Sequence, residues 1–508
     1  MMPQLDKLEG DMSAVKRRFL GSTPVQGYMR SAIRWNAMII TAVPLIGCAS
    51  PGYDNVAMKA AMVLPEAYFA QDDSYMEPEA LASWWQNFDD PILGDLIERT
   101  LVANNDLAEA RARLAAARAG VRVARGARLP SLSAGGSVNR QEMIRGDGVE
   151  STGFQIGLDA AWEADVFAGL RASETAARAS AQSSEASLYN VQRTILAEVA
   201  LNYIDLREAQ AQSTVTKNNL AIQNDNLQIG QWRYQAGLVS ALDVEQARSL
   251  RDQTAARVPV IEQAIAAAIN NIDVLAGQNP GSSIAELTPV RPIAIGPDDI
   301  GTGLPAGLLQ RRPDIIMAER NLAAESALIG VAEADLYPQL RLTGSLNSSS
   351  LSLGGLMDSV IGNLIGSVTA PIFQGGQIRA RIDQQKADAA AALAIYRGTV
   401  LTALGDVENS LVAVKRSRER EASLKTAEQA ARETVRMSEI NYRNGLSDFT
   451  VLLSAQRDLL TVQDSLTSAT AARATAAIQL YKALGGGWNM PGVEPSPDQF
   501  SDNERIKP

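Results

Sequence analysis

The sequence contains an internal duplication, and this feature limits the folds open to the chain more than any other. A shift of 208 positions aligns the sequence with itself across most of its length. The matched residues include Leu114-Ala115-Ala116 with Leu322-Ala323-Ala324, Pro130 with Pro338, Glu198-Val199 with Asp406-Val407, and Tyr234 and Gly237 with Tyr442 and Gly445. Solenoid repeats are about 20–50 residues long, so this longer repeat indicates two copies of one half-molecule.

The duplication and the segments on either side of it divide the chain into six predicted parts. They are a signal peptide at 1–47, a lipidated N-terminal segment at 48–97, a first repeat at 98–287, a proline- and glycine-rich linker at 288–305, a second repeat at 306–488 and a C-terminal tail at 489–508.

Each copy contains a long stretch without proline, in which good helix formers such as alanine, glutamine and arginine dominate. These stretches predict helices over about 172–235 and 378–443, each near 100 Å long at about 1.5 Å per residue. A glycine turn at Gly237 or Gly445 then leads into a shorter returning helix. Polar residues interrupt the apolar stripe of the long helices, which suits a helical wall with water on one side better than a solid bundle.

Ahead of each predicted long helix lie two segments in which apolar and polar residues alternate. They lie at 131–139 and 152–162 in the first copy, and at about 340–347 and 363–370 in the second. Alternation over about ten residues is typical of a strand that crosses a membrane with one side in lipid and one in water. A soluble hairpin with one buried face predicts the same alternation, so the pattern alone leaves both interpretations open.

Four strands cannot form a closed membrane barrel by themselves. Every backbone amide in lipid needs a hydrogen-bond partner, which excludes an open sheet edge, and the smallest outer-membrane barrels have about eight strands. If the strands lie in a membrane, several chains must therefore share one barrel. Two chains would give about eight strands around a filled interior, whereas three would give about twelve, with room for water. We expect an oligomeric tube in which a β-barrel continues into a helical cylinder.

The only cysteine, Cys48, follows a short basic region and an apolar run at 35–47. This run is too short to span a bilayer and is typical of a signal-peptide core. Its end, LIGC, resembles the bacterial lipobox, which implies acylation of Cys48, palmitate included, and anchoring in outer-membrane lipid. The alternative is a small buried free cysteine. Met29 is a candidate for the true start of translation.

The composition disfavours several classes of function. Histidine is absent, cysteine occurs once and the net charge is −10. The commonest general base and transition-metal ligand are therefore missing, an internal disulfide is impossible, and nucleic acid is disfavoured as a partner. No glycine-rich stretch has the Lys-Ser/Thr ending of a nucleotide-binding loop. We predict no catalytic site, no metal site and no cofactor, and thus no enzyme. No stretch after the leader has 18 consecutive apolar residues, so no membrane-spanning helix is expected.

Four segments occur in a characteristic order along 81–488. They are SWWQNFDDPILGDLIERTLVANNDLAEARARL (83–114), WEADVFAGLR (162–171), LLQRRPDIIMAERNLAAESALIGVAEADLYPQL (308–340) and APIFQGGQIR (370–379). In this order they resemble the TolC-like outer-membrane efflux proteins, and especially the OprM/NodT-type lipoprotein branch. The resemblance implies a homotrimer with a twelve-stranded barrel in the outer membrane and a periplasmic α-barrel of long antiparallel hairpins. It also implies docking to a periplasmic adaptor protein, and through the adaptor to an inner-membrane pump.

The resemblance also assigns candidate gate residues to the two helical turns. Asp243 matches the family's gate aspartate, and Tyr442 matches a tyrosine that takes part in bonds at the tip. Three copies of Asp243 would form an acidic ring. The alternative for Asp243 is an acid in the first turn of a helix, favoured by the helix dipole. The second tip departs from the family, since Val451 stands where relatives are often acidic and Asp448 is out of register.

The turns themselves are the expected docking surface for the adaptor. They comprise Gly237 and Leu238 in the first copy and Gly445 and Leu446 in the second. Trp162, at the end of a predicted strand, fits either an interfacial aromatic belt or a protein core.

These features predict a passive outer-membrane exit duct of a tripartite efflux system, for drugs or small toxic compounds. Two alternatives of the same class are a duct for type I protein secretion and a duct for a metal-ion pump. An alternative of another class is a non-conducting, lipid-anchored coiled-coil scaffold, which the paired alternating strands disfavour.

Overall fold

A computed structural model describes residues 65–70, 81–142, 144–145 and 150–489, all within one compact unit, Ser50–Pro508. The predicted signal peptide, Met29 and Cys48 lie outside the described residues, as does the C-terminal tail beyond residue 489. The acylation of Cys48 therefore stays a prediction.

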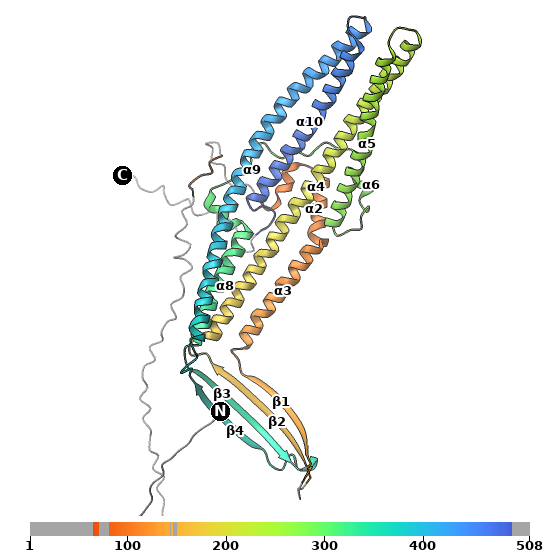
Figure 1. Ribbon diagram of the computed structural model, residues 1–508. Helices are drawn as coiled ribbons and strands as arrows, with labels where there is room; N and C mark the ends of the chain where they lie inside the picture. Colours follow the sequence, from red (N-terminus) through yellow and green to blue (C-terminus); the bar gives the residue numbers. More distant parts are fainter. Residues whose placement is uncertain (1–64, 71–80, 143, 146–149, 490–508) are drawn as a thin grey trace, which may run out of the picture. The chain divides into compact units, whose positions relative to one another are not determined.

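The two copies fold into the same series of elements (Figure 1). The first copy comprises α3 (Asn105–Gly126), β1 (Ser131–Gln141), β2 (Ser151–Ala164), α4 (Gly169–Gln235) and α5 (Ala241–Leu275). The second comprises α8 (Pro313–Ala334), β3 (Gln339–Ser350), β4 (Ile361–Thr369), α9 (Gln377–Arg443) and α10 (Phe449–Ala483). Helices α8, α9 and α10 begin and end 208 residues after α3, α4 and α5. The prediction of a mainly helical chain with two pairs of strands is confirmed.

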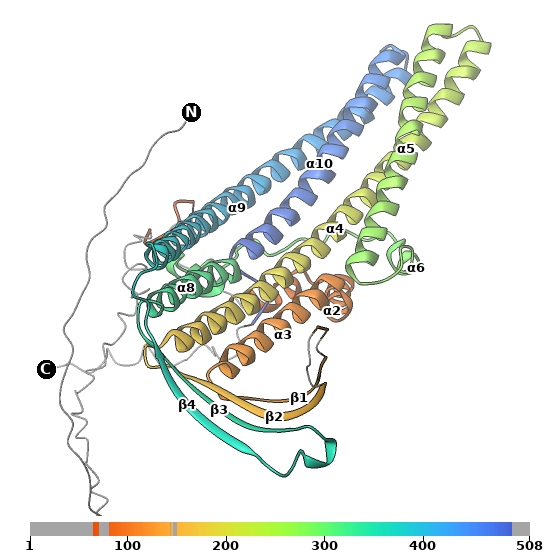
Figure 2. The ribbon, with the colours of Figure 1, turned by 60° about the horizontal axis from the view of Figure 1, so that its bottom comes forward.

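Two antiparallel helical hairpins are the largest elements of the structure. Helices α4 and α5 form one, and α9 and α10 form the other, with α4 packed against α10. Figures 1 and 2 show the hairpin turns at one end of the long helices and the four-stranded sheet at the other. Both α4 and α9 have 67 residues, which corresponds to about 100 Å.

The short elements wrap the middle of the hairpins as a belt. The belt comprises η1 (Leu81–Phe88), α2 (Pro91–Ala103), α6 (Ile284–Leu287), the linker at 288–305, which ends in η2 (Pro305–Gly307), and α7 (Leu308–Arg311). A further short turn, η3 (Leu353–Gly355), follows β3. The main hydrophobic core lies between this belt and α4, α9 and α10. Its aromatic centre is Trp84 of the belt, which stacks on Tyr481 of α10 with ring centroids 5.5 Å apart.

Two buried arginines hold the belt and its flanking segments on the hairpins. Arg207 of α4 is fully buried, and its guanidinium donates to the Pro289 carbonyl at 3.0 Å and to Tyr203 Oη at 3.1 Å. Arg312, at the start of α8, donates to Asp314 Oδ2 at 2.6 Å and to Asp406 Oδ2 at 3.0 Å. The sequence RRPD therefore forms an ion-pair network that joins the second copy's first helix to α9.

Two helices pass a composition test for membrane spans. Helices α5 and α9 each contain an 18-residue window with a mean hydropathy of 1.2 and no more than two charged residues, and 22% of each window is buried. We predicted no such helix because no stretch after the leader has 18 consecutive apolar residues. Alanine-rich helices reach this mean hydropathy although polar residues are scattered along them.

Candidate functional site

The register of the sheet places most apolar residues of the four strands on one face. The strands are antiparallel throughout, in the order β1-β2-β3-β4, and residues directly opposite one another share a face. The apolar face holds Leu132, Ala134 and Val138 of β1, Phe154, Ile156, Leu158 and Trp162 of β2, Leu340, Leu342 and Leu346 of β3, and Leu364 and Val368 of β4. The faces predicted for each strand are thus confirmed, and they coincide across strands from both copies.

The opposite face of the sheet is mainly polar, and its apolar exceptions are Ala161, Ile361 and Ile365. It holds Ser131, Ser133, Ser137 and Asn139 of β1, Gln155, Asp159 and Glu163 of β2, Arg341, Thr343, Ser345 and Asn347 of β3, and Asn363, Ser367 and Thr369 of β4. Within one chain the apolar face is uncovered: Leu132 is 73% exposed and Leu364 is 82% exposed. The sheet can therefore separate an apolar medium from an aqueous one.

Both outer strands of the sheet have a free edge. Among the described strands, β1 pairs with β2 alone and β4 pairs with β3 alone. Each outer strand thus offers a row of backbone amides and carbonyls to a further strand.

The junction between sheet and helices is fixed by polar contacts. Trp162 lies half-buried at the helical end of the apolar face, and its Nε1 donates to the Arg128 carbonyl at 3.0 Å. Arg128 also donates to Glu174 of α4. This hydrogen bond, together with one from Arg178, lowers the pKa of the Glu174 carboxyl below its ordinary value, although burial opposes the shift. The place of Trp162 in an aromatic belt stays a prediction.

The two hairpin turns have the same backbone structure. Gly237 and Gly445 both have φ +72°, a left-handed conformation that side chains disfavour. The Leu238 amide donates to the Arg233 carbonyl at 2.8 Å, and the Leu446 amide makes the equivalent bond to Asn441, also at 2.8 Å. These bonds close each helix with a Schellman turn. Leu238 and Leu446 are 71% and 75% exposed at the tips.

Asp243 has a structural role in the first tip. Ser240 is the N-cap of α5, and its side chain accepts from the Asp243 amide at 3.2 Å. In return, Asp243 Oδ2 accepts from the Ser240 amide at 2.9 Å and from its hydroxyl at 2.8 Å. This capping box satisfies amides that a helix start leaves without partners. Asp243 is therefore a helix-start acid in the structure, whereas its role in a gate stays a prediction.

The second tip lacks this arrangement. Asp448 is the N-cap of α10 but makes no side-chain cap hydrogen bond. Under the 208-residue shift, Asp448 corresponds to Ser240 and Val451 to Asp243, so the reciprocal bond is lost.

Tyr442 joins the two hairpins at their tips. Its ring packs against Phe449 with centroids 4.9 Å apart, and the Arg233 guanidinium of α4 lies 4.6 Å from the ring centroid. Tyr442 Oη and Ser447 Oγ are both buried, without a hydrogen-bond partner among the described residues. The structure thus brings Tyr442 onto Arg233, a contact that the sequence did not reveal because it joins the two copies.

The apolar part of the tips continues below this contact. Leu227 of α4, Val244 and Leu250 of α5, and Leu452 and Leu453 of α10 form a buried cluster with Phe449. In the part of the chain that the structure describes, no group of three or more acidic, cysteine or histidine side chains is placed to hold a metal ion.

Comparison with known proteins gives a consistent result. The model of a family described as outer membrane efflux protein matches residues 96–278 and 304–486. The pyoverdine export outer membrane protein OpmQ of Pseudomonas aeruginosa is 32% identical over 466 residues, which is 89% of this chain and 97% of OpmQ. Nodulation protein T of Rhizobium leguminosarum bv. viciae is 32% identical over 433 residues, 85% of this chain and 89% of the relative. The structure of the outer-membrane channel OprN superposes with a TM-score of 0.77 at 34% identity, covering 84% of this chain and 98% of OprN.

Proposed function

Because the chain belongs to the outer membrane efflux protein family, we propose that three copies of it close into one duct through the outer membrane and the periplasm. Membership confirms the resemblance to the OprM/NodT-type branch. The protein is an outer-membrane exit duct of an efflux system, and its helical part lies in the periplasm. Helices α5 and α9 accordingly belong to the periplasmic wall.

The opposite polarity of the two faces of the sheet is the observation that carries the proposed trimer. The apolar face, uncovered in one chain, contacts lipid, and the polar face lines an aqueous bore. The free edges of β1 and β4 cannot remain open in lipid, because unpaired amides there cost several kcal/mol each, so β1 of one copy pairs with β4 of the next. Three copies give about twelve strands, enough for a water-filled interior, whereas about eight would be filled by side chains.

The hairpin tips are the proposed contact with the periplasmic adaptor. Gly237, Leu238, Gly445 and Leu446 form two equivalent turns, and the exposed leucines offer apolar anchors to a partner. The adaptor links the duct to an inner-membrane pump, which supplies the energy. Cargo then passes through the bore without chemistry. The relative named for pyoverdine export supports a small compound as the cargo.

We assign the gate to the same tips, with Asp243, Tyr442 and Asp448 as its candidate residues. The buried hydroxyl of Tyr442, which has no hydrogen-bond partner among the described residues, supports this assignment, because an unsatisfied buried group favours a second arrangement of the tip in which it gains a partner. Replacing Asp243 with alanine removes both the charge and the capping bonds, whereas Asp243→Asn keeps an oxygen acceptor at the cap.

The two Asp243 variants separate the electrostatic role from the structural one. If three carboxylates hold the gate, both variants should raise single-channel conductance over the wild type. If Asp243 serves the cap alone, Asp243→Asn should conduct like the wild type, and the gate assignment would fail.

Reconstitution in planar lipid bilayers tests the function itself. The purified full-length protein should produce discrete conductance steps. The coiled-coil scaffold alternative predicts no ion current at any protein concentration, and that result would overturn the duct.

A further inference from the structure

Arginines gather where the helices of the first copy meet the sheet. Residues 118–129 and 163–178 hold six arginines, no lysine and three carboxylates, on a chain whose net charge is −10. The arginines are Arg118, Arg122, Arg125 and Arg128 in the first stretch, and Arg171 and Arg178 in the second. This end of the helices is therefore positively charged on a negatively charged chain.

Three of these arginines converge on one carboxylate, that of Glu174 on α4. The Arg128 guanidinium lies 2.5 Å from Glu174 Oε2, and the guanidinium groups of Arg178 and Arg125 lie 2.5 Å and 3.5 Å from Oε1. Glu174 is 3% exposed, whereas Arg125 is 68% exposed. Each guanidinium has five N–H donors, so one carboxylate leaves most of these donors available to a second anion.

A fourth arginine adds to the positive charge. Arg171 shares the face of α4 that carries Glu174 and Arg178, since positions i, i+3 and i+7 lie together on a helix. Its guanidinium has no hydrogen-bond or ion-pair partner among the described residues. Asp165 supplies the second negative charge, and its carboxylate accepts from the amides of Leu170 and Arg171. Four arginines thus face two carboxylates. We call Arg125, Arg128, Arg171 and Arg178 the arginine cluster.

The other acids near this level are paired or face elsewhere. Glu163 lies on the polar face of the sheet, and Glu185 pairs with Arg118 at 2.7 Å. The acids at the end of α8 pair with bases of α9, namely Asp335 with Arg381 and Glu333 with Lys386. None of these carboxylates cancels the excess charge of the arginine cluster.

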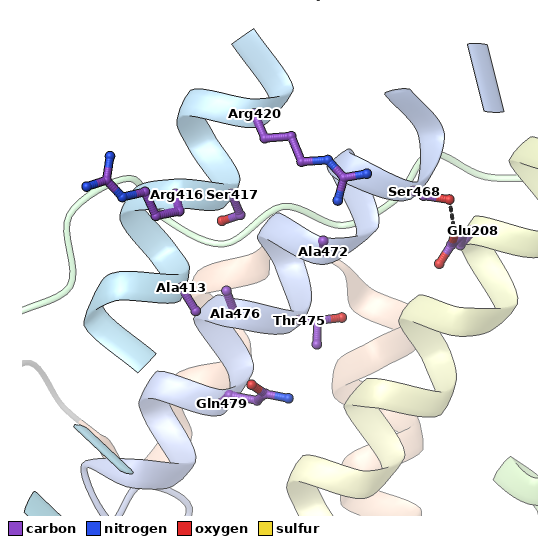
Figure 3. Close-up of a pocket in the computed structure, with 10 residues that line it drawn as sticks. All are labelled: Glu208, Ala413, Arg416, Ser417, Arg420, Ser468, Ala472, Thr475, Ala476 and Gln479. Carbon is purple, nitrogen blue, oxygen red and sulfur yellow. Dashed lines mark hydrogen bonds between the residues drawn. The ribbon is translucent and has the colours of Figure 1, made fainter. Parts of the chain in front are cut away.

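The middle of the helical wall has no comparable excess. Figure 3 shows a groove between α4, α9 and α10, in which Arg420 and Glu208 line the same space. Arg416 points away from that space and pairs with Glu419 at 2.6 Å. The excess of arginine is therefore a feature of the sheet end of the helices.

The arginine cluster lies on the outer side of the barrel, a step that rests on the proposed function. Trp162 belongs to the apolar face of the sheet, which contacts lipid in the proposed barrel. Its Nε1 donates to the Arg128 carbonyl at 3.0 Å. The chain at the end of α3 is therefore on the lipid side of the wall, away from the bore.

A neighbouring copy leaves this position open. In the proposed barrel the neighbour's β4 joins the free edge of β1, whereas α4 follows β2, on the other side of β1. The guanidinium groups of Arg125 and Arg128 reach toward α4, because they bind Glu174 there. They lie over the seam between α3 and α4 of one chain, on the side of α3 that is away from the neighbour.

The arginine cluster lies at the depth of the lipid headgroups in the periplasmic leaflet. The strands meet the helices at Ser131 and Ala164, and the headgroup layer extends about 5–8 Å beyond the hydrocarbon core. Arg128 is three residues from the start of β1, Arg125 is about 5 Å further along α3, and Arg171 is in the first turn of α4. Their side chains are thus within reach of phosphate groups.

We propose that the arginine cluster binds the phosphate of an anionic phospholipid in the periplasmic leaflet, one lipid for each chain of the duct. The planar guanidinium group suits phosphate, because it can donate two parallel hydrogen bonds to it, and basic clusters beside a membrane attract anionic lipids. The acyl chains of this lipid lie along the apolar face of the sheet, beside Trp162 and the exposed Leu129.

Native mass spectrometry of the purified full-length protein in a neutral detergent, titrated with dioleoylphosphatidylglycerol, tests this site. The wild type should bind one such lipid per chain in a saturable manner. Dioleoylphosphatidylcholine has the same acyl chains and should bind more weakly, because its choline group carries a positive charge.

A double variant removes the two most accessible arginines of the cluster. Arg125→Gln/Arg171→Gln should weaken binding of phosphatidylglycerol at least about tenfold, the loss expected for one charge-assisted hydrogen bond. Arg128 and Arg178 remain on Glu174, so the junction keeps its two shorter ion pairs. The matched control, Arg113→Gln/Arg443→Gln, also removes two exposed arginines. It should stay within about threefold of the wild type, because Arg113 lies about 20 Å further along α3 and Arg443 is at a hairpin tip.

Three results would overturn the proposal. They are equal affinity of the wild type and Arg125→Gln/Arg171→Gln for phosphatidylglycerol, equal affinity of the wild type for the two lipids, and displacement of phosphatidylglycerol by equimolar inorganic phosphate, which would indicate a site for free phosphate. Conductance separates these failures from failure of the duct: a wild type that conducts without preferring the anionic lipid disproves the lipid site alone.

Discussion

Replacing Arg312 with alanine should destabilise the protein more than any exposed arginine substitution does. Arg312 is 3% exposed. Its guanidinium donates to Asp314 Oδ1 at 3.0 Å and Oδ2 at 2.6 Å, to Asp406 Oδ2 at 3.0 Å and to the Ala483 carbonyl at 3.1 Å. Alanine leaves two carboxylates and a buried carbonyl without this donor.

The size of this loss of stability depends on the contacts that Asp314 and Asp406 keep when Arg312 is removed. Removing one member of a buried ion pair costs about 3–5 kcal/mol. The low end applies here, because Asp314 keeps Arg193 at 3.4 Å and the Ile315 amide at 2.9 Å, and Asp406 is 47% exposed and regains water. With an unfolding entropy of about 2.1 cal/mol/K per residue over 508 residues, a loss of about 3 kcal/mol lowers Tm by about 3 °C.

Thermal unfolding of the detergent-solubilised protein, followed by helical circular dichroism, measures this shift. The control is Arg113→Ala, which removes a 78% exposed side chain paired with Glu109. It should change Tm by about 1 °C or less, since exposed pairs contribute at most about 1 kcal/mol. If Arg312→Ala and Arg113→Ala melt at the same temperature, the buried network does not stabilise the fold and the reasoning is refuted. In an Asp314→Ala background, Arg312→Ala should cost less than it does alone.

Two further predictions concern the ion-pair network around Arg312 and the glycine that follows α5. Burial raises the pKa of the Asp314 carboxyl, but hydrogen bonds from Arg312 and the charge of Arg193 outweigh it, so this pKa lies below its ordinary value of 3.8. The stability that Asp314 contributes is then present above about pH 4 and lost as the pH falls through its lowered pKa; a Tm profile should fall at acid pH, and the fall should be smaller in Asp314→Asn. Gly277 has φ +68°, and an added Cβ would lie 2.2 Å from the Ala103 carbonyl oxygen, so Gly277→Ala should lower Tm. Gly120→Ala, in α3 with nothing within 4 Å of the added Cβ, should raise stability by about 0.5–1 kcal/mol; a Gly277→Ala protein as stable as Gly120→Ala would contradict the steric argument.

The duplication made the helical part of the fold predictable. Helices expected over 172–235 and 378–443 occur at Gly169–Gln235 and Gln377–Arg443. Helix α4 begins three residues early, because the Asp165 carboxylate accepts from the amides of Leu170 and Arg171 and caps its first turn. Such local caps depend on a loop conformation that periodicity does not report.

The faces of the strands were predictable, whereas their pairing was not. Alternation assigns each side chain to one of two faces, but only the register shows that the apolar set of β2 continues into that of β3, from the other copy. Alternation alone left a soluble hairpin possible.

Contacts between the two copies could not be predicted from the sequence. Arg233 of the first copy lies over Tyr442 of the second, and Arg193 of the first copy pairs with Asp314 of the second. The capping role of Asp243 did have a local signal, since Ser240 precedes it by three residues.

Disulfide formation between copies tests the trimeric barrel most directly. In a Cys48→Ala background, Ser133→Cys on β1 is combined in turn with Asn363→Cys, Ile365→Cys or Ser367→Cys on β4. Within one chain, β1 and β4 are three strand spacings apart, about 14 Å, which is too far for a disulfide. At least one pair should give covalent dimers and trimers, and nothing larger, on a non-reducing gel. A ladder that ends at the dimer, or oxidation confined to single chains, would contradict a barrel completed by three copies.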